Sequence, residues 1–342
     1  MSKQVLLTKG PLLNNKGNLN QAGYAFSLEK EYNRKAIKKM AFRIKEWDYY
    51  YIGDDKYGIA LTVADNSYMS LVSISVLDFI NKVESTKSYM GWLTFGELNL
   101  PSSSKTGDVH HKGKKFNMYF KNDSGKRRLV CEMKNVAKGK DFKCDVILNE
   151  TLDKSMVIAT PFKKNRHFYY NQKINLLRAT GSFSFGDLSY NFPKDTFGVL
   201  DWGRGVWTYS NTWYWASLSF KCEGHNVGFN LGYGFGDTTN ASENMFFYDQ
   251  EAYKLDDVTF NIPKDKKGKD DYLSEWTFTS NSGDINLVFT PIIDRYSNTN
   301  ALIIQSKQHQ VFGIFNGEIK VNDKTYKITN CLGFAEKVKN RW

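Results

Sequence analysis

The stretch VGFNLGYGF, from Val227 to Phe235, alternates large apolar residues with glycine and asparagine. Successive side chains of a β-strand point to opposite faces, so one face of this strand is bulky and the other is bare backbone apart from Asn230. A bare strand face allows another part of the fold, or a ligand, to approach closely. We therefore predict a strand that lies directly against a ligand or a second element.

A similar alternation occurs half the chain earlier, in YGIALTVA from Tyr57 to Ala64. The strand-like segment before each alternation begins with a tryptophan, Trp47 in the first case and Trp213 in the second. One small-faced strand is expected in any twisted antiparallel sheet, but two copies at half-length spacing favour a duplicated unit. We interpret the pattern as an internal repeat of layout rather than of residue identity.

Strand periodicity continues along most of the chain, which has 342 residues, 15% aromatic residues and only six prolines. We predict an all-β protein of two similar antiparallel units, each a sheet curled into a barrel-like sandwich. The predicted divisions are an N-terminal extension over 1–40, a first unit over 41–190 and a second unit over 191–342. One short helix is expected over Ser27–Met40, where an imperfect cap precedes a thin apolar stripe.

The charge and the reactive residue types exclude several functions. The net charge is +11, but the basic residues are scattered, so we expect no nucleic-acid partner, whereas an acidic small ligand is compatible with the charge. The four cysteines form no Cys-x-x-Cys pair and the five histidines have no metal-binding spacing. We therefore expect reduced cysteines, no metal and no cofactor.

The first twenty residues lack the apolar core and cleavage site of an export signal, and long apolar runs are absent from the chain. We therefore predict a cytoplasmic protein with no stable membrane insertion. The sequence does not indicate an oligomeric state.

The richest aromatic segment is FGVLDWGRGVWTYSNTWYWASLSF, from Phe197 to Phe220, which also contains Asp201 and Arg204. We expect these two residues to lie near one another in a turn between Gly203 and Gly205. Burial among indoles would raise the pKa of Asp201 and make it a proton donor, whereas the guanidinium would lower that pKa. In the second case the pair would brace the two units or receive a polar group of a substrate.

Pocket-wall candidates come from the same region and from the bare strand. Trp213 and Trp215 share one strand face with two serines, a mixture of aromatic area and hydroxyls that suits a pocket but also occurs in cores. Glu243 is either a partner carboxylate for acid/base work or a loop acid that closes a turn. The predicted catalytic residues are Asp201, Arg204 and Glu243, and the predicted ligand-binding residues are Trp202, Trp207, Trp213, Trp215 and Asn230.

Four segments together resemble the bacterial family described as domain of unknown function 2804 over nearly the whole chain: LDWGRGVWTYSNTWYWASLSF, NLGYGFGDTTNASENMFF, GNLN with YNRKAIKKMAFRIKEWDYYYIGDD, and LTVADNSYMSLVSISVLDF. More distantly, Asp201 before Trp-Gly, followed by Trp213-Tyr214-Trp215, is similar to the Asp-His-x-Trp-Gly and Trp-Asp-Trp layout of the AttH-like and carotenoid hydratase (hydroxyneurosporene synthase) superfamily. This resemblance implies tandem lipocalin-like units and, for some members, acid-catalysed hydration or cyclisation of apolar substrates. Trp202 stands here in place of the histidine, and Arg204 is added.

Three functions remain open at this stage, so whether the protein is an enzyme is also open. The first is a cofactor-independent acid/base enzyme of hydratase, isomerase or cyclase type that acts on a largely apolar or ring-shaped small molecule. The second is a carrier or sensor that binds such a molecule unchanged. The third is a carbohydrate-active protein that uses tryptophan platforms and two carboxylates, which a shallow exposed groove would favour.

Overall fold

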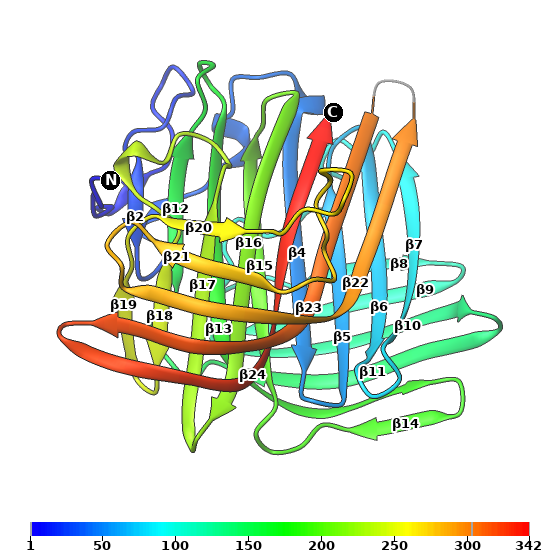
Figure 1. Ribbon diagram of the computed structural model, residues 1–342. Coiled ribbons are helices and arrows are strands. Elements are labelled where there is room, and N and C mark those ends of the chain that lie inside the picture. The colour runs from blue at the N-terminus through cyan, green and yellow to red at the C-terminus, as the bar shows by residue number, and fades with distance from the viewer. Residues whose placement is uncertain (1, 302–303, 342) are drawn as a thin grey trace.

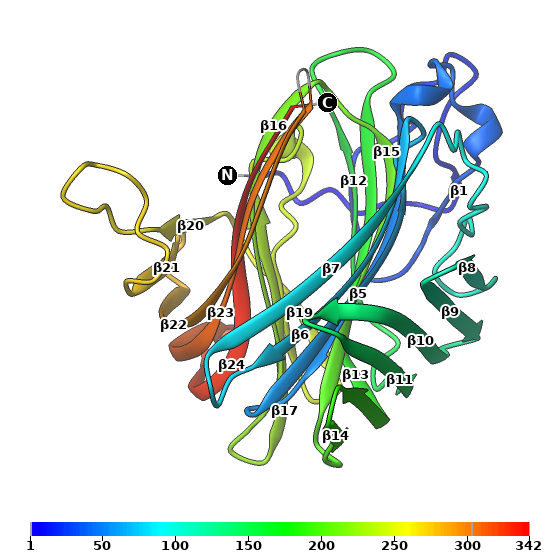
Figure 2. The same cartoon turned by 90° about the vertical axis from the view of Figure 1, so that its right-hand side faces the viewer.

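The structure, a computed structural model, describes residues 2–301 and 304–341 and is almost entirely β (Figure 1). It contains a thirteen-stranded and a nine-stranded antiparallel sheet, each strongly curled, and a small parallel pair of β1 (Gly10–Pro11) and β3 (Lys30–Glu31). Figure 2 shows the two large sheets edge-on as two layers. The fold confirms the predicted all-β protein of two tandem lipocalin-like units.

The first sheet starts with a meander of four strands: β4 (Ile44–Gly53), β5 (Tyr57–Asp65), β6 (Met69–Asp78) and β7 (Val83–Trp92). A second run of strands returns to it: β8 (Val109–Gly113), β9 (Phe116–Asp123), β10 (Lys126–Ala137), β11 (Lys140–Asn149), β13 (Phe168–Phe185) and β15 (Phe197–Val206). The last of these, β15, pairs with β4 and so joins the two runs. Two short strands, β12 (Met156–Pro161) and β14 (Leu188–Asn191), pair with β13, and β2 (Gly23–Ala25) pairs with β12.

The second sheet repeats this order. Its meander consists of β16 (Ser210–Cys222), β17 (His225–Tyr233), β18 (Met245–Tyr248) and β19 (Glu251–Lys254). The return run consists of β20 (Val258–Asn261), β21 (Trp276–Ser280), β22 (Ile285–Ala301), β23 (Ile304–Val321) and β24 (Lys324–Arg341), and β24 pairs with β16 as β15 pairs with β4. Sheet membership changes between Val206 and Ser210, so β15 lies in the first sheet, whereas the predicted division placed it in the second unit.

The helix predicted over Ser27–Met40 is wrong. The segment holds β3 and a single 3-10 turn, η1 (Arg34–Ala36), and a second such turn, η2 (Ala41–Arg43), follows it. The Tyr32 side chain is buried in the first core, and its hydroxyl donates a hydrogen bond to Glu46 Oε1 at 2.6 Å. A helix this short is marginal by itself, so tertiary packing decides the conformation of the segment.

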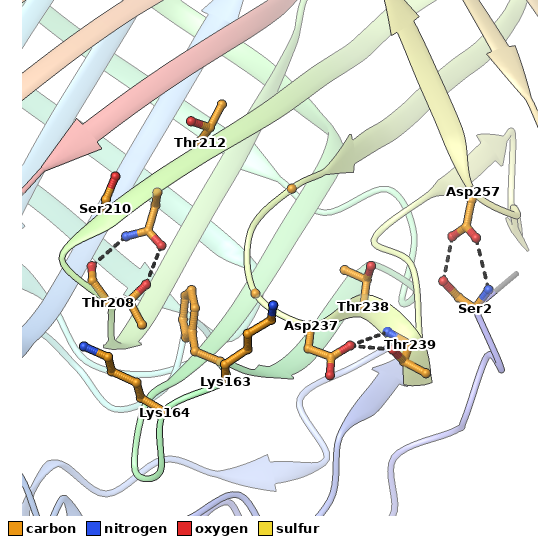
Figure 3. Close-up of a pocket in the computed structure, with 14 residues that line it drawn as sticks. Ser2, Lys163, Lys164, Thr208, Ser210, Thr212, Asp237, Thr238, Thr239 and Asp257 are labelled. Carbon is orange, nitrogen blue, oxygen red and sulfur yellow. Dashed lines mark hydrogen bonds between the residues drawn. The ribbon is translucent and has the colours of Figure 1, made fainter.

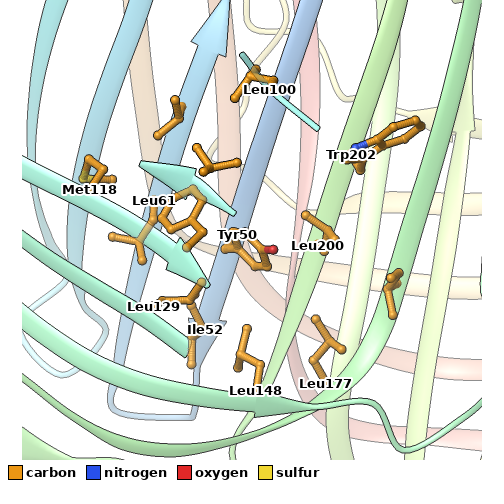
Figure 4. Close-up of a cluster of buried hydrophobic side chains, with 14 of the residues drawn as sticks. Tyr50, Ile52, Leu61, Leu100, Met118, Leu129, Leu148, Leu177, Leu200 and Trp202 are labelled. Carbon is orange, nitrogen blue, oxygen red and sulfur yellow. The ribbon is translucent and has the colours of Figure 1, made fainter. Parts of the chain in front are cut away.

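One face of each sheet packs on that sheet's own hydrophobic core. We call this face the inner face and the opposite face the outer face. The first core contains Tyr50, Leu61 and Trp202 (Figure 4), and the N-terminal segment adds Leu7 and Leu12 to it. The second core is rich in phenylalanine and includes Phe229, Trp276, Phe289 and Phe315. The outer faces of the two sheets pack against one another through a further cluster that draws residues from both, among them Tyr51, Val199, Trp215, Phe312 and Phe334.

The bare face of β17 packs closely against β13 of the first sheet. A Cβ at Gly228 would lie 3.1 Å from Leu176 Cγ, because a bulge in β13 with Leu176 at φ 56° projects toward this glycine. The neighbouring Asn175 Nδ2 donates hydrogen bonds to Leu218 O at 2.9 Å and Phe229 O at 3.1 Å. Glycine at 228 therefore allows a side chain of the first sheet to bond directly to the backbone of the second.

Replacing Asn175 by alanine should destabilise the protein by about 1 to 3 kcal/mol, because it removes donors from a buried inter-sheet contact. Urea unfolding followed by tryptophan fluorescence measures the change. Asn281→Ala, in an exposed turn of the second sheet, is the matched control and should stay within about 0.5 kcal/mol of the wild type. Equal stability of the two variants would contradict this account of the sheet contact.

Candidate functional site

A cavity of about 620 Å³ lies between the outer faces of the two sheets. Aromatic side chains from both units line its inner end: Trp47, Tyr49, Tyr169, Trp207, Trp213, Trp215 and Phe235. Trp207 stands between the two repeat-related tryptophans, with its ring centroid 4.9 Å from that of Trp47 and 6.0 Å from that of Trp213. This end of the cavity is therefore suited to a flat, apolar ring system.

A row of cross-strand neighbours in the first sheet forms one wall. Asp201 on β15 pairs with Lys173 on β13 and with Tyr49 on β4. Lys173 Nζ lies 2.8 Å from Asp201 Oδ2, and Asn171 Nδ2 donates to Asp201 Oδ1 at 2.6 Å. The same ammonium lies 3.6 Å from the ring centroid of Trp215. Both carboxylate oxygens of Asp201 are thus engaged by groups of its own sheet.

The equivalent row of the second sheet forms the opposite wall. Glu336 on β24 pairs with Gln310 on β23 and with Trp215 on β16. Because β24 and β15 hold the same place in their sheets, Glu336 is the counterpart of Asp201. Glu336 accepts hydrogen bonds from Trp213 Nε1 at 3.0 Å and from Gln310 Nε2 at 3.2 Å. Burial raises the pKa of this carboxyl above its usual range.

Glu243 is the third carboxyl of the cavity and lies between the 3-10 turn η3 (Thr238–Asn240) and β18. Its carboxyl packs against the bare face of β17, where a Cβ at Gly232 would lie 2.8 Å from Glu243 Cδ. Burial raises the pKa of Glu243 to about 7; the charge of Lys173 opposes this rise and that of Asp201 adds to it. Glu243 can therefore hold a proton near neutral pH.

Asn230 connects this carboxyl residue to the aromatic wall. Trp215 Nε1 donates to Asn230 Oδ1 at 2.7 Å, and Asn230 Nδ2 donates to the backbone oxygen of Glu243 at 2.6 Å. Asn230 is fully buried, so it fixes Trp215 and the Glu243 backbone relative to one another. It lies behind the cavity wall and is not among the residues that line the cavity.

The predicted pairing of Asp201 with Arg204 is wrong. The two residues lie three apart on strand β15, so their side chains point to opposite faces. Arg204 is fully buried on the inner face, where its Nη1 lies 2.9 Å from Asp48 Oδ1 and its Nη2 donates to Pro101 O at 2.8 Å. Gly203 marks no turn; it makes room for the Trp47 indole, with which an added Cβ would collide.

Trp202 also lies on the inner face, within the first core, rather than in the cavity (Figure 4). The Arg204 guanidinium lies 4.4 Å from its ring centroid, so the two residues form one structural contact. The geometry thus separates the predicted site residues. It places in the cavity lining Asp201, Glu243, Trp207, Trp213 and Trp215.

Sequence reasoning missed several residues of the cavity, including Lys173, Glu336 and Arg295. A signal existed for Lys173, which is the only charged residue in the otherwise uncharged stretch FYYNQKINLL from Phe168 to Leu177. Glu336 likewise follows an apolar run, but Lys337 beside it makes the pattern resemble an ordinary surface strand. Their contact with Asp201 or Trp213 depends on strand register, which residue types alone do not specify.

A second, more open hollow of about 800 Å³ lies near the N-terminus (Figure 3). Its acidic residues are already used in local contacts: Asp257 Oδ1 and Oδ2 accept hydrogen bonds from Ser2, and Asp237 Oδ1 accepts one from the Thr239 backbone. Phe162 lines this hollow and packs on Phe235, with ring centroids 5.2 Å apart, and Phe235 lines the cavity between the sheets. The cavity between the sheets, which is less open and has three buried carboxyl groups, is the better candidate site.

Within residues 2–301 and 304–341, no three His, Cys, Asp or Glu side chains gather closely enough to hold a metal ion. The four cysteines are free and buried. In the same part of the chain, no helix has the length and apolar character needed to cross a membrane. The cytoplasmic location and the bacterial origin stay predictions.

The comparisons with known proteins agree with this fold. A model of the family described as domain of unknown function (DUF2804) matches residues 3–342, as the sequence resemblance implied. A kievitone hydratase from Nectria haematococca is structurally similar with a TM-score of 0.51 and 10% identity, over 97% of this chain and 98% of that chain. A Nitrosomonas europaea protein described as an AttH has a TM-score of 0.46 and 11% identity, over 90% and 95% of the two chains. No curated protein matches the sequence significantly.

Arg204 forms a buried ion pair with Asp48 in the first unit. Arg204→Gln should therefore lower the free energy of unfolding by about 3 to 5 kcal/mol, because Asp48 would stay buried without its partner. Chemical denaturation measures this loss. Arg128→Gln breaks the exposed ion pair with Asp145, for which 55% and 48% of the two side chains are accessible, and should cost no more than about 1 kcal/mol. A stable Arg204→Gln protein with altered ligand binding would instead place this arginine in the site.

Proposed function

Because the chain belongs to the DUF2804 family, whose description assigns no activity, we propose its function from the chemistry of the cavity. The protein is an acid/base enzyme of hydratase, isomerase or cyclase type that needs no cofactor and acts on a ring-shaped, largely apolar small molecule. The observation that carries this proposal is the buried Glu243 carboxyl at the aromatic inner end of the cavity between the sheets.

The aromatic end supplies binding and orientation. A flat substrate packs against the aromatic lining of this end, where Trp215 of the second sheet and Tyr49 of the first contact one another edge to face, with ring centroids 6.0 Å apart at 77°. Burial of its rings displaces water from the cavity, and the loss of water strengthens every electrostatic interaction inside. The substrate is thereby held beside Glu243 and Lys173.

Glu243 is the proton donor in the proposed reaction. In a hydration, its proton passes to one carbon of a substrate double bond, water adds to the other carbon, and the second proton of that water returns to the Glu243 carboxylate. In an isomerisation, the proton returns from a different carbon. Lys173 stabilises the transient carboxylate, since its charge favours the ionised form of Glu243.

The structural neighbour from Nectria haematococca is named as a hydratase, which supports the reaction class by analogy of fold. The third possibility, a carbohydrate-active protein, receives less support, because Trp207 and Trp215 are buried at the inner end of the cavity rather than displayed in a shallow groove, and Asp201 is held by Lys173 and Asn171. Glu243 thus takes the donor role that the sequence analysis had considered for Asp201.

A non-catalytic carrier is the second candidate function. It is favoured by the bonding of Asp201 and Glu336, whose carboxylate oxygens all accept hydrogen bonds or an ion pair from fixed neighbours. Such a wall can bind a molecule but has no free carboxylate to react with it. Whether Glu243 transfers a proton therefore distinguishes the enzyme from the carrier.

Glu243→Gln should slow proton transfer strongly while leaving ligand binding intact. The assay incubates the protein in D₂O with a panel of unsaturated ring compounds and measures deuterium gain by mass spectrometry. We expect the variant to exchange about 10²- to 10⁴-fold more slowly than the wild type. Because the donor is the protonated form, wild-type turnover should fall as the pH rises through about 7.

Glu251→Gln is the matched control, since Glu251 is exposed on β19, and it should exchange at the wild-type rate. Exchange by Glu243→Gln at the wild-type rate would contradict the donor role. Binding of the compounds by the wild type with no exchange from any of them would favour the carrier.

A further inference from the structure

We infer that the ligand of this cavity carries an anionic group, a carboxylate or another oxyanion, which pairs with Arg295 in the outer part of the cavity. The inference rests on the proposed function, because it concerns the molecule that binds beside Glu243. It adds a recognition residue and a substrate class, namely a flat ring system with one acidic end.

Arg295 belongs to the same transverse row of the second sheet as the carboxyl residues. It pairs with Gln310 across β22 and β23, Gln310 pairs with Glu336, and Glu336 pairs with Trp215. Strands lie about 4.8 Å apart in a sheet, so three steps along the row separate Arg295 from Trp215 by about 14 Å along the sheet. The two ends of the row are therefore an aromatic end and a cationic end.

The Arg295 guanidinium is incompletely satisfied by the protein. Its Nη1 donates to Ser75 Oγ at 2.8 Å, but its Nε is buried and has no hydrogen-bond partner. Among the described residues, no carboxylate forms an ion pair with it, in contrast to Lys173, which is paired with Asp201. A guanidinium has five N–H donors and matches an oxyanion with two parallel hydrogen bonds.

The wall opposite Arg295 is made mainly of hydroxyl groups. Ser88 Oγ donates to Ser73 Oγ at 2.9 Å, and both residues line the cavity. Glu84 is the carboxylate of this wall, and its Oε2 accepts a hydrogen bond from Thr86 Oγ1 at 2.7 Å. Neutral hydroxyls beside one cation form a suitable environment for an anionic group, and the net charge of +11 attracts such a ligand to the protein.

The competing explanation is that Arg295 serves only to balance the charge of Glu336. The Arg295 cation does favour the ionised form of Glu336, but it comes last among the influences on that pKa, after burial, Trp213, Lys173 and Asp201. Glu336 is instead satisfied by direct hydrogen bonds from Trp213 and Gln310. The two explanations differ in a measurable way, because charge balance affects every ligand and oxyanion recognition affects only acidic ones.

A matched pair of fluorescent dyes tests this inference. 8-Anilinonaphthalene-1-sulfonate and N-phenyl-1-naphthylamine share one ring skeleton, and only the first carries an anionic group. We expect Arg295→Gln to weaken binding of the sulfonate dye about 10- to 100-fold and binding of the neutral dye by less than about threefold. Lys307→Gln removes the same charge from an exposed position of β23 outside the cavity lining and should change neither affinity beyond about threefold.

Two results would overturn the inference. Equal weakening of both dyes by Arg295→Gln would show a structural role, and equal loss of sulfonate binding in Lys307→Gln would show only the general field of the protein. The dye test measures binding without proton transfer, so its outcome is distinguishable from that of the Glu243→Gln exchange assay. If the wild type transfers no protons but Arg295→Gln still weakens binding of the sulfonate dye, the protein is an anion-binding carrier.

Discussion

The close approach of the two sheets at the bare face of β17 is the constraint on which the rest of the structure depends. Gly228 accommodates Leu176 of the first sheet, and Gly232 accommodates the Glu243 carboxyl. Larger side chains at these positions would push the sheets apart and admit water to the carboxyl. The same alternation of large and small residues thus brings the units together and buries the proposed proton donor.

The site exists only where the two units meet, and the duplication explains its layout. Asp201 and Glu336 occupy equivalent strands, yet the neighbour of Asp201 is Lys173 and the neighbour of Glu336 is Gln310. One carboxylate is therefore balanced by a cation and the other by neutral donors. The two opposite walls of the cavity therefore differ in their charged groups, whereas two identical units would make the walls alike.

Much of the fold followed from the sequence, because period-two alternation and repeated tryptophans specify strands and their duplication directly. The site followed only in part. Asp201, Glu243 and three tryptophans reach the cavity, but Arg204 does not, since residues three apart on a strand point to opposite faces and the glycine beside it serves Trp47 rather than a turn. Lys173, Glu336 and Arg295 come from distant strands of two sheets, and strand register together with the packing of the sheets places them in one cavity.

The most direct test of the account is the titration of Glu243 itself, by ¹³C NMR of protein labelled at the glutamate side-chain carboxyl, with Glu243→Gln to assign the signal. The account predicts one glutamate resonance that titrates at about pH 7 and is missing from the variant. The physical cause is burial between the sheets, which disfavours the carboxylate. A Glu243 signal that titrates near the ordinary glutamate value of about 4.3 would contradict the account.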